Sequence, residues 1–179
     1  LMKRILGMII TVILLLLNLP VNISAEVSGD FKYSISDGNA TIISYTGTAE
    51  SLVFPNTIDG YPVTRLEGST STLFPNDRGI TSITIPDSVT YFSTYALEWC
   101  KNLTSIIVDS NNKTYSSDNN GILYNKDKTE LLRCPLKKSG TALIPDSVKS
   151  IGRSAFYDCG NLSGVIIPYG VTNIDVDAF

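Results

Sequence analysis

Apolar residues in this chain return at a fixed interval. The pentapeptide Ile-Pro-Asp-Ser-Val at residues 85–89 recurs unchanged at residues 144–148, and a looser copy at residues 167–171 follows the second by 23 positions. The apolar positions are kept between copies, while the residues between them vary among Ser, Thr, Asp, Lys and Tyr. A fixed period in this range is typical of a solenoid, whose stacked coils share one apolar core. The pattern therefore predicts a mainly β solenoid of about five coils.

Each repeat opens with a short strand in which inward and outward side chains alternate. A period of two assigns one apolar set to the core: Ile83 and Ile85, Ile106 and Val108, Ala142 and Ile144, and Val165 and Ile167. The residue between each pair, with its equivalent in the first unit, faces outward: Val53, Thr84, Ile107, Leu143 and Ile166. A second outward row of small residues flanks this one: Ser51, Ser82, Ser105, Thr141 and Gly164.

The row Val53, Thr84, Ile107, Leu143 and Ile166, called the outward row below, is the candidate binding site. Four of its five residues are apolar, and stacked coils would set them about 4.8 Å apart. A contiguous exposed apolar stripe usually marks an interaction surface, so we hypothesise that it docks a partner protein or an extended peptide. The alternative is that single exposed aliphatic residues are ordinary and that β-branched residues simply suit strands.

Two segments depart from the repeat and predict β-hairpins. Residues 31–45 alternate in apolarity on both sides of Asp37-Gly38, a dipeptide typical of tight hairpin turns. The first coil of a solenoid has one face without a neighbour, so this hairpin is expected to lie across that face as an N-terminal cap. Residues 121–132 hold two apolar runs around a polar turn and predict an inserted hairpin, which should alter the surface without ending the stack.

The repeat also carries a family resemblance. Residues 139–161 hold most of the pattern Leu-x-x-Ile-x-Ile-Pro-x-x-Val-x-x-Ile-Gly-x-x-Ala-Phe-x-x-Cys-x-Asn, and the insertion reads Leu-Tyr-Asn-Lys-Asp-Lys-Thr at residues 123–129. This pattern resembles the BspA-type leucine-rich repeat of bacterial surface proteins, over most of the chain after about residue 31. The resemblance implies a leucine-rich-repeat fold and an extracellular role in adhesion and interaction.

Residues 1–25 have the organisation of a secretory signal peptide. Lys3 and Arg4 precede an apolar core, and the segment ends on the small residue Ala25. We expect cleavage before Glu26, which leaves a hairpin cap at residues 26–50 and a solenoid at residues 51–179 with an incomplete last repeat. The alternative is an uncleaved anchor, because the apolar core is near the length of about 17 residues that spans a membrane. The protein is thus expected to be secreted or held at the cell surface.

The charge balance makes nucleic acid an unexpected partner. Removal of residues 1–25 takes away two of the 14 basic residues and none of the 17 acidic ones, which changes the formal net charge from −3 to −5. Binding to phosphates needs clustered Lys and Arg, and this chain offers only Lys137 and Lys138 near Arg133. No membrane contact is expected beyond the signal peptide.

The residue types needed for catalysis are largely missing. The chain has no His, which excludes a Ser-His-Asp or Cys-His arrangement and removes imidazole as a metal ligand. Carboxylates could act as acid and base without His, but those available lie in Asn- and Ser-rich turns, where Asp is expected for local backbone bonding: Asp109, Asp118, Asp127 and Glu130. Calcium is a weaker option because Lys113 stands where a loop site needs an oxygen ligand. We therefore expect no enzyme, no metal and no cofactor.

The three cysteines are predicted to be buried thiols. Cys100 and Cys159 occupy the same repeat position, where Cys acts as a small apolar residue. If the insertion contributes one coil, these two lie on the order of 10 Å apart, beyond the reach of a disulfide. Cys134 belongs to the inserted unit, and the odd count argues against full pairing.

Together these features favour a secreted or cell-surface binding module that contacts a protein or a host extracellular-matrix ligand through its strand face. The alternative is a structural spacer or display element within a larger surface protein. Trp99 is of a type enriched in binding hot spots, although a single aromatic beside Cys100 is more often a packing residue. The sequence leaves the oligomeric state open.

Overall fold

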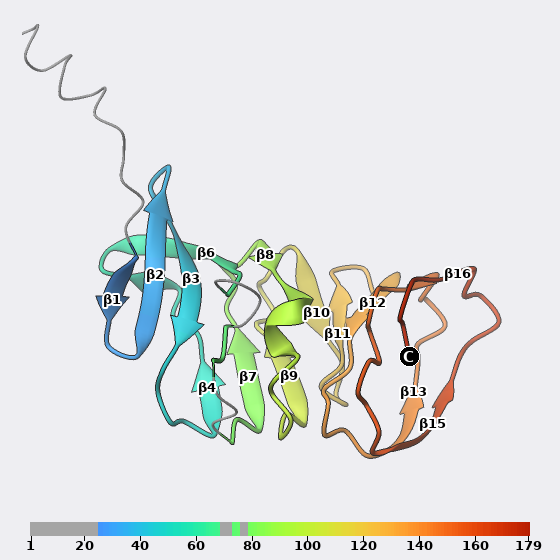
Figure 1. Ribbon diagram of the computed structural model, residues 1–179. Helices are drawn as coiled ribbons and strands as arrows, with labels where there is room; N and C mark the ends of the chain where they lie inside the picture. The colour runs from blue at the N-terminus through green and yellow to red at the C-terminus, as the bar shows by residue number, and fades with distance from the viewer. Residues whose placement is uncertain (1–24, 69–72, 76–78) are drawn as a thin grey trace, which may run out of the picture.

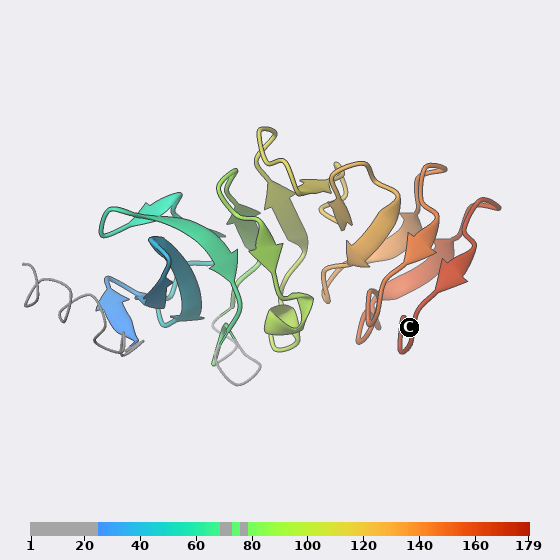
Figure 2. The same cartoon turned by 90° about the horizontal axis from the view of Figure 1, so that it is seen from above.

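The computed structural model describes residues 25–68, 73–75 and 79–179. The predicted signal peptide lies outside these residues, apart from Ala25. The described chain contains one 3-10 helix, η1 (Thr94–Leu97), and no α-helix. Its strands follow one another along a single axis from the blue N-terminal end to the red C-terminal end (Figures 1 and 2). The mainly β solenoid predicted from the repeat is therefore confirmed.

One side of each coil is formed by a repeat strand, as the period of two predicts. The repeat strands β4 (Ser51–Val53), β7 (Ser82–Ile85) and β9 (Ser105–Val108) form a parallel three-stranded sheet. Two further repeat strands, β13 (Gly140–Leu143) and β15 (Leu162–Ile166), form a separate parallel pair. The predicted inward residues of β7 are fully buried, as are Ile106 and Ala142, whereas Ile167 beyond β15 is exposed. No repeat strand in the described residues packs beyond β15.

The opposite side of the coils is formed by return strands in two larger sheets. In the first, β1 (Glu26–Ser28), β2 (Phe31–Ser36) and β3 (Asn39–Tyr45) lead to β6 (Tyr61–Leu66), which pairs with β5 (Thr57–Ile58) and β8 (Tyr91–Phe92). The second contains β10 (Tyr115–Ser117), β11 (Leu123–Asn125), β12 (Glu130–Arg133), β14 (Ser150–Ile151) and β16 (Asn173–Ile174). Return strands of successive coils pair in parallel (β6 with β8, β12 with β14, and β14 with β16), since each coil repeats the path of the one before. The hairpin strands in these sheets pair antiparallel.

The N-terminal hairpin extends the first return sheet. Asp37 (φ 51°) and Gly38 (φ 74°) both have positive φ, as a two-residue hairpin turn requires. β3 pairs in parallel with β6, so the hairpin adds strands to the edge of this sheet. We expected it instead to lie across the end of the first coil. Four aromatic rings join it to the first coil, with centroids 5.2 to 6.3 Å apart: Phe31, Tyr45, Phe54 and Phe74.

A second tight turn, absent from our sequence prediction, forms at Asp59 (φ 48°) and Gly60 (φ 86°). It joins β5 to β6 and brings the Asp59 carboxylate back to the cap. The Tyr33 hydroxyl lies 2.7 Å from Asp59 Oδ2 and 3.0 Å from Glu26 Oε2, and Ser28 Oγ donates to Asp59 Oδ1 at 2.9 Å. The hydrogen bonds from Tyr33 and then Ser28 hold the pKa of Asp59 below its ordinary value of 3.8.

This cluster should make the stability of the cap depend on pH. Because the pKa of Asp59 is lower in the folded state, its stabilisation is present above the ordinary value and is lost as the pH falls through the folded pKa. Tyr33→Phe and Asp59→Asn should each cost more unfolding free energy at pH 7 than at pH 2. Urea unfolding at both pH values measures this difference. The double variant should lose little more than either single one, and equal costs at the two pH values would contradict the prediction.

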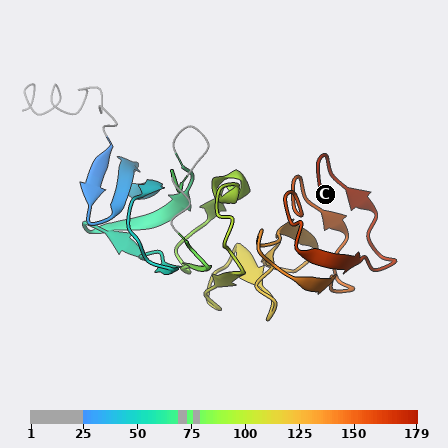
Figure 3. The ribbon, with the colours of Figure 1, turned by 60° about the horizontal axis from the view of Figure 1, so that its bottom comes forward.

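The inserted hairpin forms as predicted but does not lie outside the stack. β11 and β12 pair antiparallel around Lys128, which has a φ of 52°. Ile106 N of β9 donates to Gly121 O at 2.9 Å, and Val108 N donates to Ser117 Oγ at 3.0 Å. The insertion therefore takes the edge of β9 that the next repeat strand would occupy. Figure 3 shows the yellow insertion between the green and orange parts of the array.

The insertion also divides the hydrophobic core into two clusters. Leu123 packs in the N-terminal cluster, whereas its neighbours Ile122 and Tyr124 pack in the C-terminal cluster. Successive side chains of a strand point to opposite faces, so β11 separates the two clusters and contributes side chains to both. Our expectation of a surface insertion was wrong because its apolar residues are needed to cover the coils on both sides.

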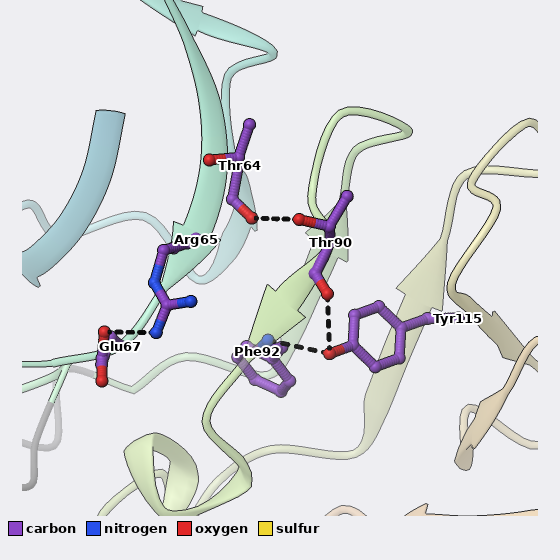
Figure 4. A network of polar contacts seen from close by, with 6 residues as sticks. All are labelled: Thr64, Arg65, Glu67, Thr90, Phe92 and Tyr115. Carbon is purple, nitrogen blue, oxygen red and sulfur yellow. Dashed lines mark hydrogen bonds and ion pairs between the residues drawn. The ribbon is translucent and has the colours of Figure 1, made fainter. Parts of the chain in front are cut away.

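Tyr115 and Asn112 close the junction between the two return sheets. The edge of β8 offers Phe92 N, which donates to the Tyr115 hydroxyl at 3.0 Å, and Thr90 O, which lies 3.5 Å from that hydroxyl (Figure 4). On the other side, Thr90 N donates to Thr64 O at 2.9 Å, as in a regular parallel coil. The Tyr115 side chain thus replaces strand pairing where the first sheet ends.

Candidate protein-interaction surface

The structure brings the outward row together in two groups. Val53, Thr84 and Ile107 are direct partners in the parallel register of β4, β7 and β9. Leu143 and Ile166 are partners in the register of β13 and β15. No single sheet contains all five residues, since the insertion occupies the edge of β9. The predicted continuous stripe is therefore two shorter apolar patches, one on each side of the insertion.

The side chains of the outward row point away from the core. Val53 is 64% exposed, Leu143 and Ile166 are each 57% exposed, Ile107 is 46% exposed and Thr84 is half-buried. On the same strands Leu52, Ile83, Ile85, Ile106 and Ala142 are buried, whereas Val108 and Val165 are half-buried. About half or more of the surface of each aliphatic side chain in the outward row is therefore available to a partner.

Small polar residues border the row and are hydrogen-bonded to one another. Ser51 Oγ and Ser82 Oγ lie 2.6 Å apart, and Thr141 Oγ1 lies 3.4 Å from Ser163 Oγ. At the start of the repeat strands, Thr81 Oγ1 donates to Glu50 O at 3.1 Å and Thr104 Oγ1 donates to Thr81 O at 2.9 Å. These bonds satisfy the hydroxyl groups within the protein, which leaves a border of short side chains that lets another surface approach closely.

The repeat strands carry no charge. None of the residues in β4, β7, β9, β13 and β15 is Asp, Glu, Lys or Arg, although 17% of the chain is charged. Depletion of charged residues is the compositional mark of the buried centre of a protein interface. The surface is thus apolar and hydroxyl-rich, and is chemically suited to a protein or peptide.

Two of the four carboxylates considered for catalysis or metal binding, Asp109 and Asp118, accept hydrogen bonds from the backbone. Asp109 Oδ1 accepts a hydrogen bond from Asn111 N at 2.8 Å, and Asp118 Oδ1 accepts from Asn120 N and Ile122 N, both at 2.9 Å. This is the turn role predicted from the sequence. The described part of the chain brings no three His, Cys, Asp or Glu residues together in a way that suits a metal ion.

Three features of the surface and core escaped the sequence analysis. Trp99 is 53% exposed, although we favoured a packing role for it. Cys134 lies beside Cys159, which follows it by 25 residues in the sequence. Arg133 is fully buried between coils. The near-period separation of the two cysteines is a signal that could have revealed their contact, whereas nothing in the sequence marks Arg133 as buried.

The comparisons with known proteins agree with the repeat pattern. Residues 62–130 and 133–179 match the BspA type leucine rich repeat region in six copies. The repeat pattern in the sequence predicted about five coils. Because the match spans well over half of the chain, this protein belongs to the BspA-type leucine-rich repeat family. No curated protein sequence matches the chain.

Several solved structures share this fold. They include a leucine-rich repeat protein from Eubacterium ventriosum (TM-score 0.53, 22% identity), a leucine rich cell surface protein from Faecalibacterium prausnitzii (0.53, 22%) and the leucine rich repeat protein of T. pallidum (0.53, 22%). Each alignment covers 87% of this chain but 62%, 46% and 66%, respectively, of the other chain. At this identity the likeness shows the fold alone.

The part of the chain that the structure describes contains no helix with the length and hydrophobicity of a membrane span.

Proposed function

We propose that this chain is a secreted or cell-surface module that binds a protein partner through the outward row, without catalysis. The observation that carries the proposal is the row itself: four exposed aliphatic side chains on five repeat strands that hold no charged residue. Exposed apolar side chains that gather on one face of a protein often mark an interaction surface. A host extracellular-matrix protein is the partner class that the family's surface role suggests.

Export to the cell surface is part of the same proposal. The tripartite pattern of residues 1–25 supports secretion, and one structural neighbour is named a cell surface protein. We further propose that residues 26–50 act as the N-terminal cap and that residues 51–179 form the binding array. The break at the insertion suggests two contact patches, which an extended partner would engage together.

The test is to place charge on both patches. The variant Ile107→Asp/Leu143→Asp should lose at least about 100-fold in affinity for its matrix ligand, since a charge facing an apolar partner is left unpaired on binding. Both side chains are exposed, so the melting temperature should change by less than about 2 °C. Biolayer interferometry over immobilised collagen, fibronectin and laminin measures the affinity, and thermal unfolding measures the stability.

A matched control lies outside the outward row. Val27 is 65% exposed, so Val27→Asp makes a similar change outside the row and should bind normally. Binding that survives in the Ile107/Leu143 variant would contradict the proposed site. Absence of binding to any matrix protein by the unchanged chain would favour the spacer or display role.

A further inference from the structure

Two buried thiols meet between neighbouring coils on the C-terminal side of the insertion. Cys134 follows β12 and Cys159 follows β14, which pairs with β12. The Sγ atoms of both residues lie 3.7 Å from Pro135 O, and Cys159 Sγ also lies 3.6 Å from Cys134 O. The two thiols therefore share one carbonyl oxygen as a neighbour, which places them side by side. They are 25 residues apart in sequence, about one repeat, so a covalent bond between them would link successive coils.

A buried cation without a full set of partners stands beside this pair. The Arg133 side chain is 1% exposed, and its Nη1 donates to Ser154 O. Its Nε and Nη2 are buried and make no hydrogen bond within the described structure. An uncompensated guanidinium in the core is costly. Burial lowers the pKa of Arg133, and the negative charge of a Cys159 thiolate would oppose that shift. A thiolate at Cys159 would supply the negative charge that this site lacks.

The two thiols differ in their access to small molecules. Cys159 lines an open cavity of about 400 Å³ whose other walls include Phe156, Leu162 and Val165. Cys134 is fully buried behind it. The interaction with Cys134 and the charge of Arg133 lower the pKa of the Cys159 thiol, whereas the interaction with Cys159 and burial raise the pKa of Cys134. Cys159 is therefore the more accessible thiol and the one whose pKa is lowered, as an attacking thiol requires, and Cys134 lies where a resolving thiol would be needed.

We propose that Cys134 and Cys159 form a redox-modification site, which a small disulfide oxidant converts to a disulfide that staples two coils, with Arg133 holding the Cys159 thiolate. The thiolate attacks one sulfur of the oxidant to form a mixed disulfide and releases one thiol. Cys134 then gives up its proton and attacks the Cys159 sulfur, which releases the second thiol. Two protein thiols are oxidised to one disulfide, and the oxidant is reduced to two thiols. The structure has all three cysteines as buried free thiols, as predicted from the sequence, and is the reduced form of this site.

Oxidised glutathione is the probe for this site. The reduced full chain, incubated with it under native conditions and then denatured and alkylated, should retain one alkylated cysteine where the starting protein has three. Peptide mapping should find Cys134 linked to Cys159 and Cys100 alkylated. Cys100→Ser should form the same link, whereas Cys134→Ser should stop at a glutathione adduct on Cys159. In urea, where the fold imposes no contact, all three pairings should appear.

The role of Arg133 has a separate readout. Arg133→Met should slow the native reaction at pH 7 by about threefold for each unit by which the pKa of Cys159 rises, because a tenfold smaller thiolate fraction is partly offset by a more nucleophilic thiolate. At pH 9 and above the rate should match or exceed that of the unchanged chain. Arg133→Lys, which keeps the charge, should restore part of the rate at pH 7. An identical pH profile in Arg133→Met would overturn the role of the cation. Three alkylated cysteines after native incubation, or a link that includes Cys100, would overturn the disulfide.

Discussion

Asn112→Ala is expected to lower the free energy of unfolding by about 3–4 kcal/mol, the largest effect of a polar substitution in this chain. The Asn112 side chain is completely buried and makes all four of its hydrogen bonds. Nδ2 donates to Pro86 O at 2.8 Å and to Val89 O at 2.9 Å, while Oδ1 accepts from Thr114 N and Tyr115 N, both at 2.8 Å. Alanine would leave two buried carbonyl groups and two amide groups without this partner.

The location of Asn112 makes the effect cooperative. Its donors hold the turn of the preceding coil, and its acceptor fixes the start of β10, from which Tyr115 reaches the edge of β8 (Figure 4). Thermal unfolding should show a melting temperature lower by about 10 °C, given 2–4 °C per kcal/mol for a domain of this size. Asn111→Ala is the matched control, because Asn111 is exposed and should change the unfolding free energy by less than about 0.5 kcal/mol. Equal effects of the two substitutions would show that Asn112 does not hold the junction.

The repeat strands and the outward row could be predicted because each rests on a short-range rule. Alternation within a strand decides which of two neighbours is buried, so Ile83 and Thr84 needed no knowledge of distant contacts. The hairpin at Asp37-Gly38 follows from the same kind of local signal. The similar Asp59-Gly60 turn was missed because the strand before it, β5, has two residues and shows no alternation.

The junction at the insertion could not be predicted because it depends on contacts between distant segments. The sequence marks the departure from the repeat after Val108 but does not show which edge the inserted strands will take. That Ile122 and Leu123 enter different core clusters is a result of packing on both sides at once. The burial of Arg133 has the same origin, since its equivalent in the next coil, Arg153, is exposed and lies 4.0 Å from Asp177.

The insertion therefore has a structural role that the repeat pattern hides. It ends one repeat sheet at β9 and separates the two core clusters. It also contains Arg133 and Cys134, which are both buried. The same segment divides the outward row into patches. A partner that binds both patches would contact surfaces whose relative position depends on how firmly the insertion is held against β9.

Gly121→Ala tests that attachment and is expected to cost about 3–5 kcal/mol of unfolding free energy. Gly121 has a φ of +74°, and an added Cβ would lie 2.5 Å from Ser105 Oγ and 2.7 Å from Ser105 Cα. The second of these atoms belongs to the backbone of β9, so a side-chain rotation cannot relieve the clash. The strand and the insertion would have to separate, which would also weaken the 2.9 Å hydrogen bond from Ile106 N to Gly121 O.

Gly38→Ala is the control that measures the cost of backbone strain without this clash. Gly38 has the same φ of +74°, but an added Cβ there has nothing within 4 Å, so only the cost of the left-handed conformation remains, about 1–2 kcal/mol. Urea unfolding of both variants should therefore show a difference of about 1–4 kcal/mol, which is the contribution of close packing between the insertion and β9. Ser105→Gly in the Gly121→Ala background should recover part of this difference, because it removes the Ser105 side chain but leaves the clash with the backbone of β9. Equal costs at Gly121 and Gly38 would mean that the insertion is not pressed against β9, and that the two patches of the outward row are free to move relative to each other.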